Sequence, residues 1–399
     1  METLIYGGPV FTAEIDNLQL GWAVLIADKR ITAVGPLDEL TARAPQATRL
    51  DVGQRTILPG LIDAHRHLIG PSAAEITPEL IASGAILGVR VAQDTLTAGI
   101  TTVRDPGCKH DAIFELRRAI HAGLVPGPAI YAAGRNPTGQ AAPRRWRNHY
   151  VRGPWEMRQA VRELARDGAD WIKLVASHTT PASGWKFCQR YLTDEEIQAA
   201  VDETHALGMR ISAHTEGLEA ARSLVNAGAD AIEHGTVLDD DLVRRMADLG
   251  TFLVPTLWLY THDYDPATTT LDQLQAYRAF EAEHSRGFQR ALQAGVPIAV
   301  GTDAITDLPP ADCLVIELEL MHALGMNTSA ALRATTVGGA GVLGLADRLG
   351  RLAPGYQADV IAVKGDPLKD LRALTQVDLV IQRGRVCVSK LASTHTTGS

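Results

Sequence analysis

Two histidines stand one residue apart directly after an apolar run in the stretch TILPGLIDAHRHLIG, residues 56–70. Side chains at positions i and i+2 of an extended segment point to the same side, so His65 and His67 share one face. Four more polar residues follow short apolar runs in the same way: Lys173, His214, His234 and Asp303. Imidazole nitrogen and carboxylate oxygen are ligands that zinc and related first-row metals prefer. If these residues converge, they predict a metal centre.

The elements that must bring these residues together recur along the chain. From about residue 55 to 350, a helical stretch, a glycine that can cap it, a short apolar strand and a polar residue follow one another repeatedly. Eight strands are expected: one before His65, and the others within 99–105, 129–134, 168–173, 208–214, 228–234, 250–256 and 295–303. This alternation predicts an α/β fold of the (β/α)8 TIM-barrel type, in which the carboxyl ends of the strands face one mouth. A doubly wound open sheet is the alternative.

Both ends of the chain have a different pattern. Residues 1–55 and 355–390 alternate apolar and polar side chains, with turn residues between the runs. Each end alone is too short for a stable sheet domain, so the two are expected to form one composite β-sandwich. Residues 56–354 then form the catalytic barrel domain.

Composition narrows the class of protein. The 399 residues are 46% hydrophobic and 21% charged, with a formal net charge of −8, which argues against nucleic-acid binding. No apolar run is long enough to cross a membrane, and the start of the sequence does not resemble a signal peptide. The four cysteines are scattered without a CxxC pair, so a cysteine zinc site is not expected. We expect a cytoplasmic protein that acts on a small molecule and binds neither nucleic acid nor membrane.

Lys173 requires its own chemical explanation, because an ammonium group repels a divalent cation and has no lone pair to offer. Burial would lower the pKa of its amine, and a neutral amine can take up CO₂ to give a carbamate, which is anionic and has two oxygens able to bridge two metals. Two alternatives remain: Lys173 lies at the surface, or it binds a substrate carboxylate.

Together the motifs PGLIDAHRH, IKLVASH, ISAHTEG, IEHGT, GTDA and LGRLAPGYQADVIAVKGDPL resemble the amidohydrolase superfamily. Within it, the chain is similar to the imidazolonepropionase-like and prolidase-like group, which includes Xaa-Pro dipeptidases and ochratoxinase-type hydrolases. The resemblance implies two divalent metal ions, with zinc the expected element. It assigns His65, His67 and Asp303 to one ion and His214 and His234 to the other, with carboxylated Lys173 and a hydroxide bridging them. Asp303, which would take the proton of the attacking water, and His234 are the predicted catalytic residues.

The predicted reaction is hydrolysis of an amide bond. Two divalent cations lower the pKa of a shared water and polarise a carbonyl group, and Asp303 can act as general base. The expected substrates are N-acyl amino acids, dipeptides or related aryl and alkyl amides, which makes the enzyme peptidase-like. One alternative is a deaminase or imidazolonepropionase-like hydrolase of cyclic amides or amidines, with one or two metals. Related deaminases place a glutamate three residues after the fifth-strand histidine, whereas Glu216 follows His214 by two. A non-catalytic scaffold is the third interpretation.

A basic and aromatic loop at residues 134–153 replaces the Gly- and His-rich run that prolidase-like proteins usually carry after the third strand. Guanidinium groups bind carboxylates in bidentate fashion and stack on aromatic rings, which suggests a substrate with a carboxylate or an aromatic acyl group. The predicted substrate-binding residues are Arg144, Arg145, Arg147, His149, Tyr150 and, from the segment after Lys173, His178. The alternatives for this loop are a solvated surface or a subunit interface, and we expect a homo-oligomer.

Overall fold

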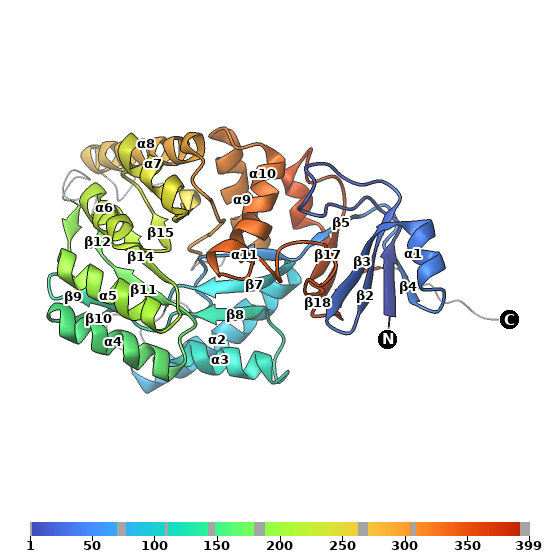
Figure 1. Ribbon diagram of the computed structural model, residues 1–399, viewed down its shortest axis with the longest axis horizontal. Coiled ribbons are helices and arrows are strands. Elements are labelled where there is room, and N and C mark those ends of the chain that lie inside the picture. Colours follow the sequence, from blue (N-terminus) through green and yellow to red (C-terminus); the bar gives the residue numbers. More distant parts are fainter. Residues whose placement is uncertain are drawn as a thin grey trace.

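The computed structural model describes residues 2–69, 77–107, 111–142, 148–178, 188–261, 270–304 and 309–391. The chain is a mixed α/β protein. In Figure 1 the helices and parallel strands of the larger part lie on the left, and strands from the two chain ends lie together on the right. No helix within these ranges is both long enough and apolar enough to cross a lipid bilayer.

Strands from the two chain ends form two four-stranded sheets. One has the order β3-β2-β1-β4, with β1 (Glu2–Tyr6), β2 (Trp22–Ala27), β3 (Arg30–Pro36) and β4 (Thr48–Asp51). The other has the order β19-β18-β17-β5, with β5 (Thr56–Pro59), β17 (Val360–Val363), β18 (Val377–Gln382) and β19 (Arg385–Ser389). Buried residues of both sheets, among them Ile5, Val24, Ile57 and Val360, belong to one hydrophobic cluster. The two ends of the chain therefore bury their apolar faces together.

Strand β5 differs from the prediction, which grouped residues 56–59 with the barrel. Its four residues pair antiparallel with β17, from Thr56 opposite Val363 to Pro59 opposite Val360. Strand β5 therefore belongs to the sheet of the chain ends, and the first parallel strand is β6 (Leu61–Asp63). Gly60 marks the change of sheet, because a Cβ atom there would lie 2.2 Å from the hydroxyl oxygen of Thr101.

Seven short, buried strands form two parallel sheets in the larger part. The first has the order β6-β7-β8, with β7 (Ile100–Asp105) and β8 (Ala129–Ala132). The second has the order β11-β14-β15-β16, with β11 (Ile172–Val175), β14 (Ile211–Thr215), β15 (Ala231–His234) and β16 (Phe252–Val254). Parallel strands are covered on both faces, which explains why nearly all of these residues are buried. Asp170 N–H donates to the Ala132 carbonyl at 2.9 Å and so links the two sheets next to β8 and β11.

The predicted eighth strand, within residues 295–303, is not a regular strand in the structure. Ile298 makes an isolated parallel bridge to Leu253, and Ala304 makes another to Arg66. Pro297 has no N–H to donate, and its carbonyl accepts the N–H of Leu253 at 2.9 Å. This segment nevertheless joins β16 to the residues after β6, because Ala64 N–H donates to the Val300 carbonyl at 2.8 Å.

Helices surround the parallel sheets in Figure 1, and their caps determine where the strands begin. Thr193 caps α5 in a capping box: its hydroxyl accepts the N–H of Glu196, whose carboxylate accepts the N–H of Thr193. Gly168 ends α4 with φ 102°, a left-handed conformation that glycine adopts without strain. The helices of this part are α2 (Pro78–Thr97), α3 (Ala112–His121), α4 (Gly153–Asp167), α5 (Asp194–Ala206), α6 (Leu218–Ala227), α7 (Asp240–Leu249), α8 (Leu271–Ala294), α9 (Pro310–Ala323), α10 (Thr328–Arg333) and α11 (Gly339–Val342).

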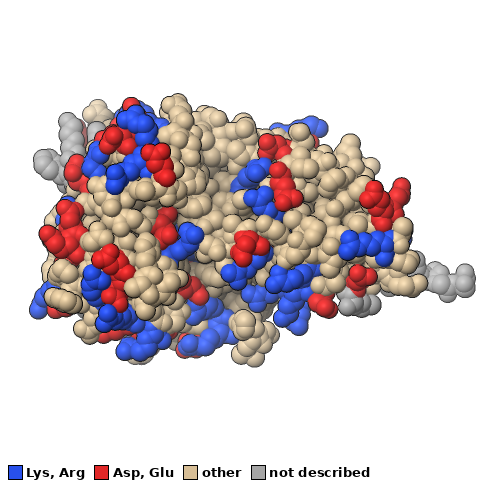
Figure 2. Space-filling model, in the orientation of Figure 1, with Lys and Arg blue, Asp and Glu red and all other residues tan. Residues whose placement is uncertain are grey.

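Shorter elements complete the described chain. Helix α1 (Leu37–Arg43) packs on the N-terminal sheet, and β9 (Asn136–Gly139) pairs with β10 (Asn148–Val151). The other short elements are β12 (Ser177–His178), β13 (Gln189–Arg190), η2 (Leu257–Tyr260), the π-helical turn η3 (Ala334–Gly338) and η4 (Leu371–Thr375). On the face drawn in Figure 2, acidic and basic side chains are interspersed rather than gathered by sign.

Candidate metal centre

Five of the six predicted metal-type residues form one contiguous cluster. The Oδ1 atom of Asp303 lies 3.0 Å from Nε2 of His67 and 3.5 Å from Nε2 of His65. The ring centroids of His65 and His234 are 5.2 Å apart, and those of His214 and His234 are 4.4 Å apart. These residues come from distant parts of the sequence, and the fold brings them together at the carboxyl ends of the strands.

Strands β6, β14 and β15 position the histidines directly. His214 lies within β14, His234 is the last residue of β15, and His65 follows the end of β6 by two residues. The carboxylate of Asp63 fixes that segment, because it accepts the N–H of His65 at 3.2 Å and both the N–H and the hydroxyl of Thr302, at 3.1 and 2.7 Å. One buried carboxylate therefore holds the segment of His65 against the segment of Asp303.

Three residues, at the end of β15, just after β16 and in the segment 295–304, have backbone conformations that are unusual for side chains with a Cβ atom. The φ angles of His234, Thr256 and Asp303 are 67°, 52° and 48°. Non-glycine residues in the left-handed region cost of order 1–3 kcal/mol each and gather at functional sites. Two of the three are predicted metal ligands, so the strain coincides with the candidate centre.

The hydrogen bonds of His67 and His234 determine which ring nitrogen faces the cluster. Nδ1 of His67 lies 2.9 Å from the carbonyl oxygen of Gly107, which can only accept, so Nδ1 carries the proton. The hydroxyl of Thr256 donates to the Pro255 carbonyl at 2.7 Å and therefore accepts from Nδ1 of His234, also at 2.7 Å. Both rings then present the lone pair of Nε2, as ligand histidines do when the other nitrogen is held by an acceptor.

His65 is held in the same way by a carboxylate. Its Nδ1 lies 2.6 Å from Oε2 of Glu233, and both side chains are buried. The carboxylate accepts the Nδ1 proton, and Nε2 of His65 is then directed toward Asp303. Three histidines of the cluster therefore offer Nε2 to the same space.

A second cluster lies beside the first. Nδ1 of His178 lies 3.2 Å from Nε2 of His214 and 3.1 Å from Oε2 of Glu216. The hydroxyl of Tyr260 donates to Oε1 of Glu216 at 3.0 Å. Of the predicted substrate-binding residues, His178 is thus in direct contact with a predicted metal ligand.

Lys173 is buried, with 2% of its surface exposed, and it is the second residue of β11. The prediction that it follows the end of its strand is wrong, because β11 continues to Val175. It lies opposite Ser212 on β14, the strand that carries His214, and its charge contributes to lowering the pKa of both His214 and His234. The alternative of a surface lysine is excluded.

The protonation states of the cluster suit metal binding. Burial lowers the pKa of His214 to about 3 and holds that of His234 well below its ordinary value. Burial alone would raise the pKa of Asp303, but His65 and His67 outweigh that effect and hold it well below the ordinary value. At neutral pH the imidazoles of His214 and His234 are therefore neutral and the carboxyl of Asp303 is ionised. These are the forms in which such side chains bind metals, so binding would not first require them to lose protons.

The donor atoms also fit a metal geometrically. Among the described residues, two groups have ligand atoms that all lie within 4.8 Å of one another: His65, His234 and Asp303, and His178, His214 and Glu216. Within the described part of the chain, Nε2 of His234 is buried and makes no hydrogen bond, while Oδ1 of Asp303 faces only the Nε2 atoms of His67 and His65. Buried polar atoms without a partner are rare and need an explanation, and a bound cation provides one.

The predicted substrate-binding loop is only partly described. Arg144, Arg145 and Arg147 lie outside the described residues. His149 and Tyr150 belong to β10, where Tyr150 packs against a small cluster that includes Val175, the last residue of β11. The structure therefore places Tyr150 near the end of the strand that carries Lys173.

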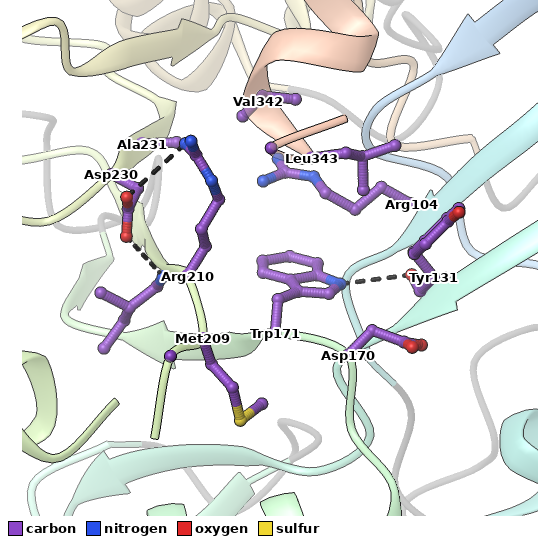
Figure 3. Close-up of a pocket in the computed structure, with 13 residues that line it drawn as sticks. Arg104, Tyr131, Asp170, Trp171, Met209, Arg210, Asp230, Ala231, Val342 and Leu343 are labelled. Carbon is purple, nitrogen blue, oxygen red and sulfur yellow. Dashed lines mark hydrogen bonds and ion pairs between the residues drawn. The ribbon is translucent and has the colours of Figure 1, made fainter. Parts of the chain in front are cut away.

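A cavity of about 160 Å³ lies at the other ends of the strands. It is lined by residues that precede or begin β11, β14 and β15, such as Asp170, Arg210 and Asp230 (Figure 3). The candidate metal ligands lie at the carboxyl ends instead. The cavity and the candidate metal ligands therefore lie at opposite ends of the parallel strands, and the cavity is a separate feature.

Sequence reasoning did not identify several side chains that hold the histidines. They are Asp63, Arg104, Ser212, Glu216, Glu233, Thr256 and Tyr260. A usable signal existed for three of them, because a charged residue inside a short apolar strand must find a partner there. Asp63, Arg104 and Glu233 all stand in such strands.

The comparison with protein families decides the membership of the chain. The model of the amidohydrolase family matches residues 56–387. The chain belongs to the amidohydrolase family. Residues 23–47 of this amidohydrolase also match a bacterial imidazolonepropionase-like composite domain. The family assignment made from the motifs is confirmed, and so is the prediction of a hydrolase that acts on carbon–nitrogen bonds.

Individual relatives cover most of this amidohydrolase. An uncharacterised protein of Mycobacterium tuberculosis is 32% identical over 348 residues, which cover 82% of this chain and 84% of the relative. Ochratoxinase of Aspergillus niger is 28% identical over 94% of this chain and 83% of its own length. The crystal structure of a Xaa-Pro dipeptidase with bound methionine superposes with a TM-score of 0.82 at 28% identity, covering 97% of this chain and 99% of the other. The dipeptidase therefore shares the fold of this chain.

Proposed function

We propose that this amidohydrolase is a binuclear metal-dependent enzyme that hydrolyses the amide bond of N-acyl amino acids, dipeptides or related aryl and alkyl amides. The observation that carries the proposal is the convergence of His65, His67, His214, His234 and ionised Asp303, in which the buried Nε2 of His234 makes no hydrogen bond to a described residue. A bound cation accounts for a buried ring nitrogen that has no hydrogen-bond partner.

The proposed ligands divide between two ions. His65, His67 and Asp303 would hold one, and His214 and His234 the other, with Lys173 as a carbamate between them. Zinc is the expected element, since imidazole and carboxylate suit it. When bound, two such ions supply Lewis acidity toward a carbonyl group and make water a better nucleophile.

Asp303 has the second proposed role, that of a general base. Its carboxylate is ionised at neutral pH, and with 12% of its side chain exposed it can still be reached from solvent. A carboxylate that contacts both His65 and His67 is held in place, so it can accept a proton at Oδ1 or Oδ2 and later return it to the leaving nitrogen. His234, the second predicted catalytic residue, would act by holding an ion with Nε2, because Thr256 already accepts from its Nδ1.

The burial of Lys173 near the proposed ligands favours its modification to a carbamate, which supports the two-metal arrangement. A buried ammonium beside His214 and His234 would repel cations, whereas a carbamate carries a negative charge and two donor oxygens. The modification requires a neutral amine, and burial favours the neutral form.

The finer description of the fold belongs to the same proposal. We propose that the two parallel sheets and residues 295–304 close into a (β/α)8 barrel, and that the sheets of the chain ends form a β-sandwich domain. The inter-sheet hydrogen bonds at Ala132, Leu253 and Val300 support the barrel, and the shared hydrophobic cluster supports the sandwich.

The substrate class rests on the relatives together with the site. Ochratoxinase and the Xaa-Pro dipeptidase are named for substrates that contain an amide bond to an amino acid. A second candidate, hydrolysis of a cyclic amide or amidine, is favoured by the imidazolonepropionase-like match at residues 23–47. Imidazolonepropionase of Geobacillus kaustophilus is 25% identical over 92% of this chain.

Two measurements test the proposal. Elemental analysis of the purified protein should find close to two divalent ions per chain, and a panel of N-acyl amino acids and dipeptides should be hydrolysed faster than cyclic amides and nucleobases. Faster turnover of the cyclic amides would favour the second candidate. Failure to bind any divalent metal would reject both.

A further inference from the structure

Glu233 is a buried carboxylate that joins several strands near the centre. Its Oε2 accepts from Nδ1 of His65 at 2.6 Å, and its Oε1 accepts from Ser212 Oγ and from an Nη2 hydrogen of Arg104, both at 2.5 Å. It is fully buried, on β15 beside His234. Three strands and the segment after β6 therefore meet at one side chain.

Arg104 donates hydrogen bonds both to the segment after β6 and to Glu233. Its Nε donates to the carbonyl of Ala64, the residue before His65, at 2.6 Å, while its Nη2 donates to Glu233. Figure 3 shows the guanidinium above the ring of Trp171, and the distance from Cζ to the ring centroid is 4.3 Å. The indole is fixed in turn, because its Nε1 donates to the carbonyl of Tyr131 at 3.2 Å.

We infer that Glu233 is a positioning residue for His65, and that Arg104 and Ser212 hold its carboxylate so that His65 keeps its proton on Nδ1 and presents Nε2 to the metal. This inference rests on the proposed function. A carboxylate that accepts the second ring proton of a ligand histidine fixes both the tautomer and the orientation of the ring. Arg104 supplies the charge that a buried carboxylate needs, and it approaches from the side of the cavity in Figure 3, away from the metal.

The electrostatics agree with this geometry. Burial alone would raise the pKa of the Glu233 carboxyl, but the charges of Arg104 and Lys173 outweigh it and hold that pKa well below its ordinary value.

The competing explanation is a purely structural ion pair, in which Glu233 only neutralises Arg104. Two substitutions separate the explanations. Glu233→Asp keeps the carboxylate but withdraws it by one methylene, so Arg104 can remain paired while the contact with His65 is lost. Glu203→Gln is the matched control, because Glu203 is also a buried carboxylate paired with arginines, Arg158 and Arg162, with no histidine in hydrogen-bond contact.

The experiment measures metal affinity by chelator competition with Zn²⁺ and the ring tautomers by nitrogen NMR of metal-free protein labelled with ¹⁵N-histidine. We expect Glu233→Gln and Glu233→Asp to weaken binding of at least one ion roughly 10- to 100-fold, and Glu203→Gln to stay within about twofold of the wild type. The wild-type spectrum should contain a histidine protonated at Nδ1 that changes in both Glu233 variants. Ser212→Ala, a milder change, should weaken binding several-fold and serves if the Glu233 variants do not fold.

Wild-type affinity and an unchanged histidine spectrum in Glu233→Asp would overturn the inference, since the structural ion pair would then suffice. Zinc affinity and the histidine spectrum also distinguish failure of this inference from failure of the proposed function. A wild-type protein that binds no Zn²⁺ would reject the proposed function, whereas the tautomer of His65 in metal-free protein would still test the role of Glu233.

Discussion

Glu317 on α9 is a buried carboxyl whose ionisation should control stability. Its two oxygens accept the backbone N–H groups of Leu257 and Trp258, each at 2.9 Å, where the turn η2 begins. That turn carries Tyr260, whose hydroxyl donates to Glu216 beside the candidate centre. Glu317 therefore fixes one wall of the site without touching a proposed metal ligand.

The size of the effect follows from the pKa. Burial raises the pKa of Glu317 from its ordinary value of 4.5 to about 8, against the opposing effect of the two N–H groups. The folded protein then holds this proton more tightly than the unfolded chain, so it binds more protons between pH 4.5 and 8. The contribution of Glu317 to stability must therefore fall as the pH rises through this window, by about 5 kcal/mol once the pH exceeds 8.

Glu317→Gln should remove this dependence, because glutamine has the shape of the protonated acid and does not ionise. Urea unfolding of metal-free protein from pH 5 to 9 provides the assay. We expect the variant to lie about 1–3 kcal/mol below the wild type near pH 5, because the amide nitrogen cannot accept one of the two backbone N–H groups. Near pH 9 the variant should exceed the free energy of unfolding of the wild type by a few kcal/mol, about 5 kcal/mol less this cost. Glu319→Gln, on the same helix but partly exposed and paired with Arg372, should show no such divergence. Wild-type and Glu317→Gln curves that run parallel across the whole range would refute the reasoning.

Three further predictions concern the candidate centre itself. Asp303→Asn should keep its metal content but lose roughly 10²- to 10⁴-fold in turnover, because an amide cannot act as the base; a kcat near that of the wild type would remove Asp303 from the mechanism. Lys173→Ala should lower metal content and activity together, and a short carboxylic acid in solution should restore part of both. Intact mass showing an unmodified lysine in a fully metallated, active enzyme would contradict the carbamate. Thr256→Val should weaken metal binding about 10- to 100-fold, because it removes the acceptor for Nδ1 of His234, whereas Thr256→Ser should bind as the wild type does; equal affinities for both variants would show that this hydrogen bond has no part in binding.

Much of the architecture was predictable because its determinants are local. Short apolar runs preceded by a glycine predict buried strands. The glycines Gly168, Gly228 and Gly250 do end helices in left-handed conformations. The capping box at Thr193 was also visible from residue types alone. Strand boundaries were less predictable, as the extension of β11 beyond Lys173 shows, since hydrogen bonding with β14 decides where a strand ends.

The sequence by itself determined which residues carry the chemistry: the paired His65 and His67, and the polar residues placed on or just after buried strands. It could not determine the partners of these residues, because contact across parallel strands depends on register rather than on distance along the chain. Glu233 reaches His65 across 168 residues of sequence. Only the tertiary structure assigned β5 to the sheet of the chain ends and decided which nitrogen of each of three histidines faces the centre. The physical reason is that a tautomer is fixed by the neighbouring donor or acceptor, and the fold alone supplies that neighbour.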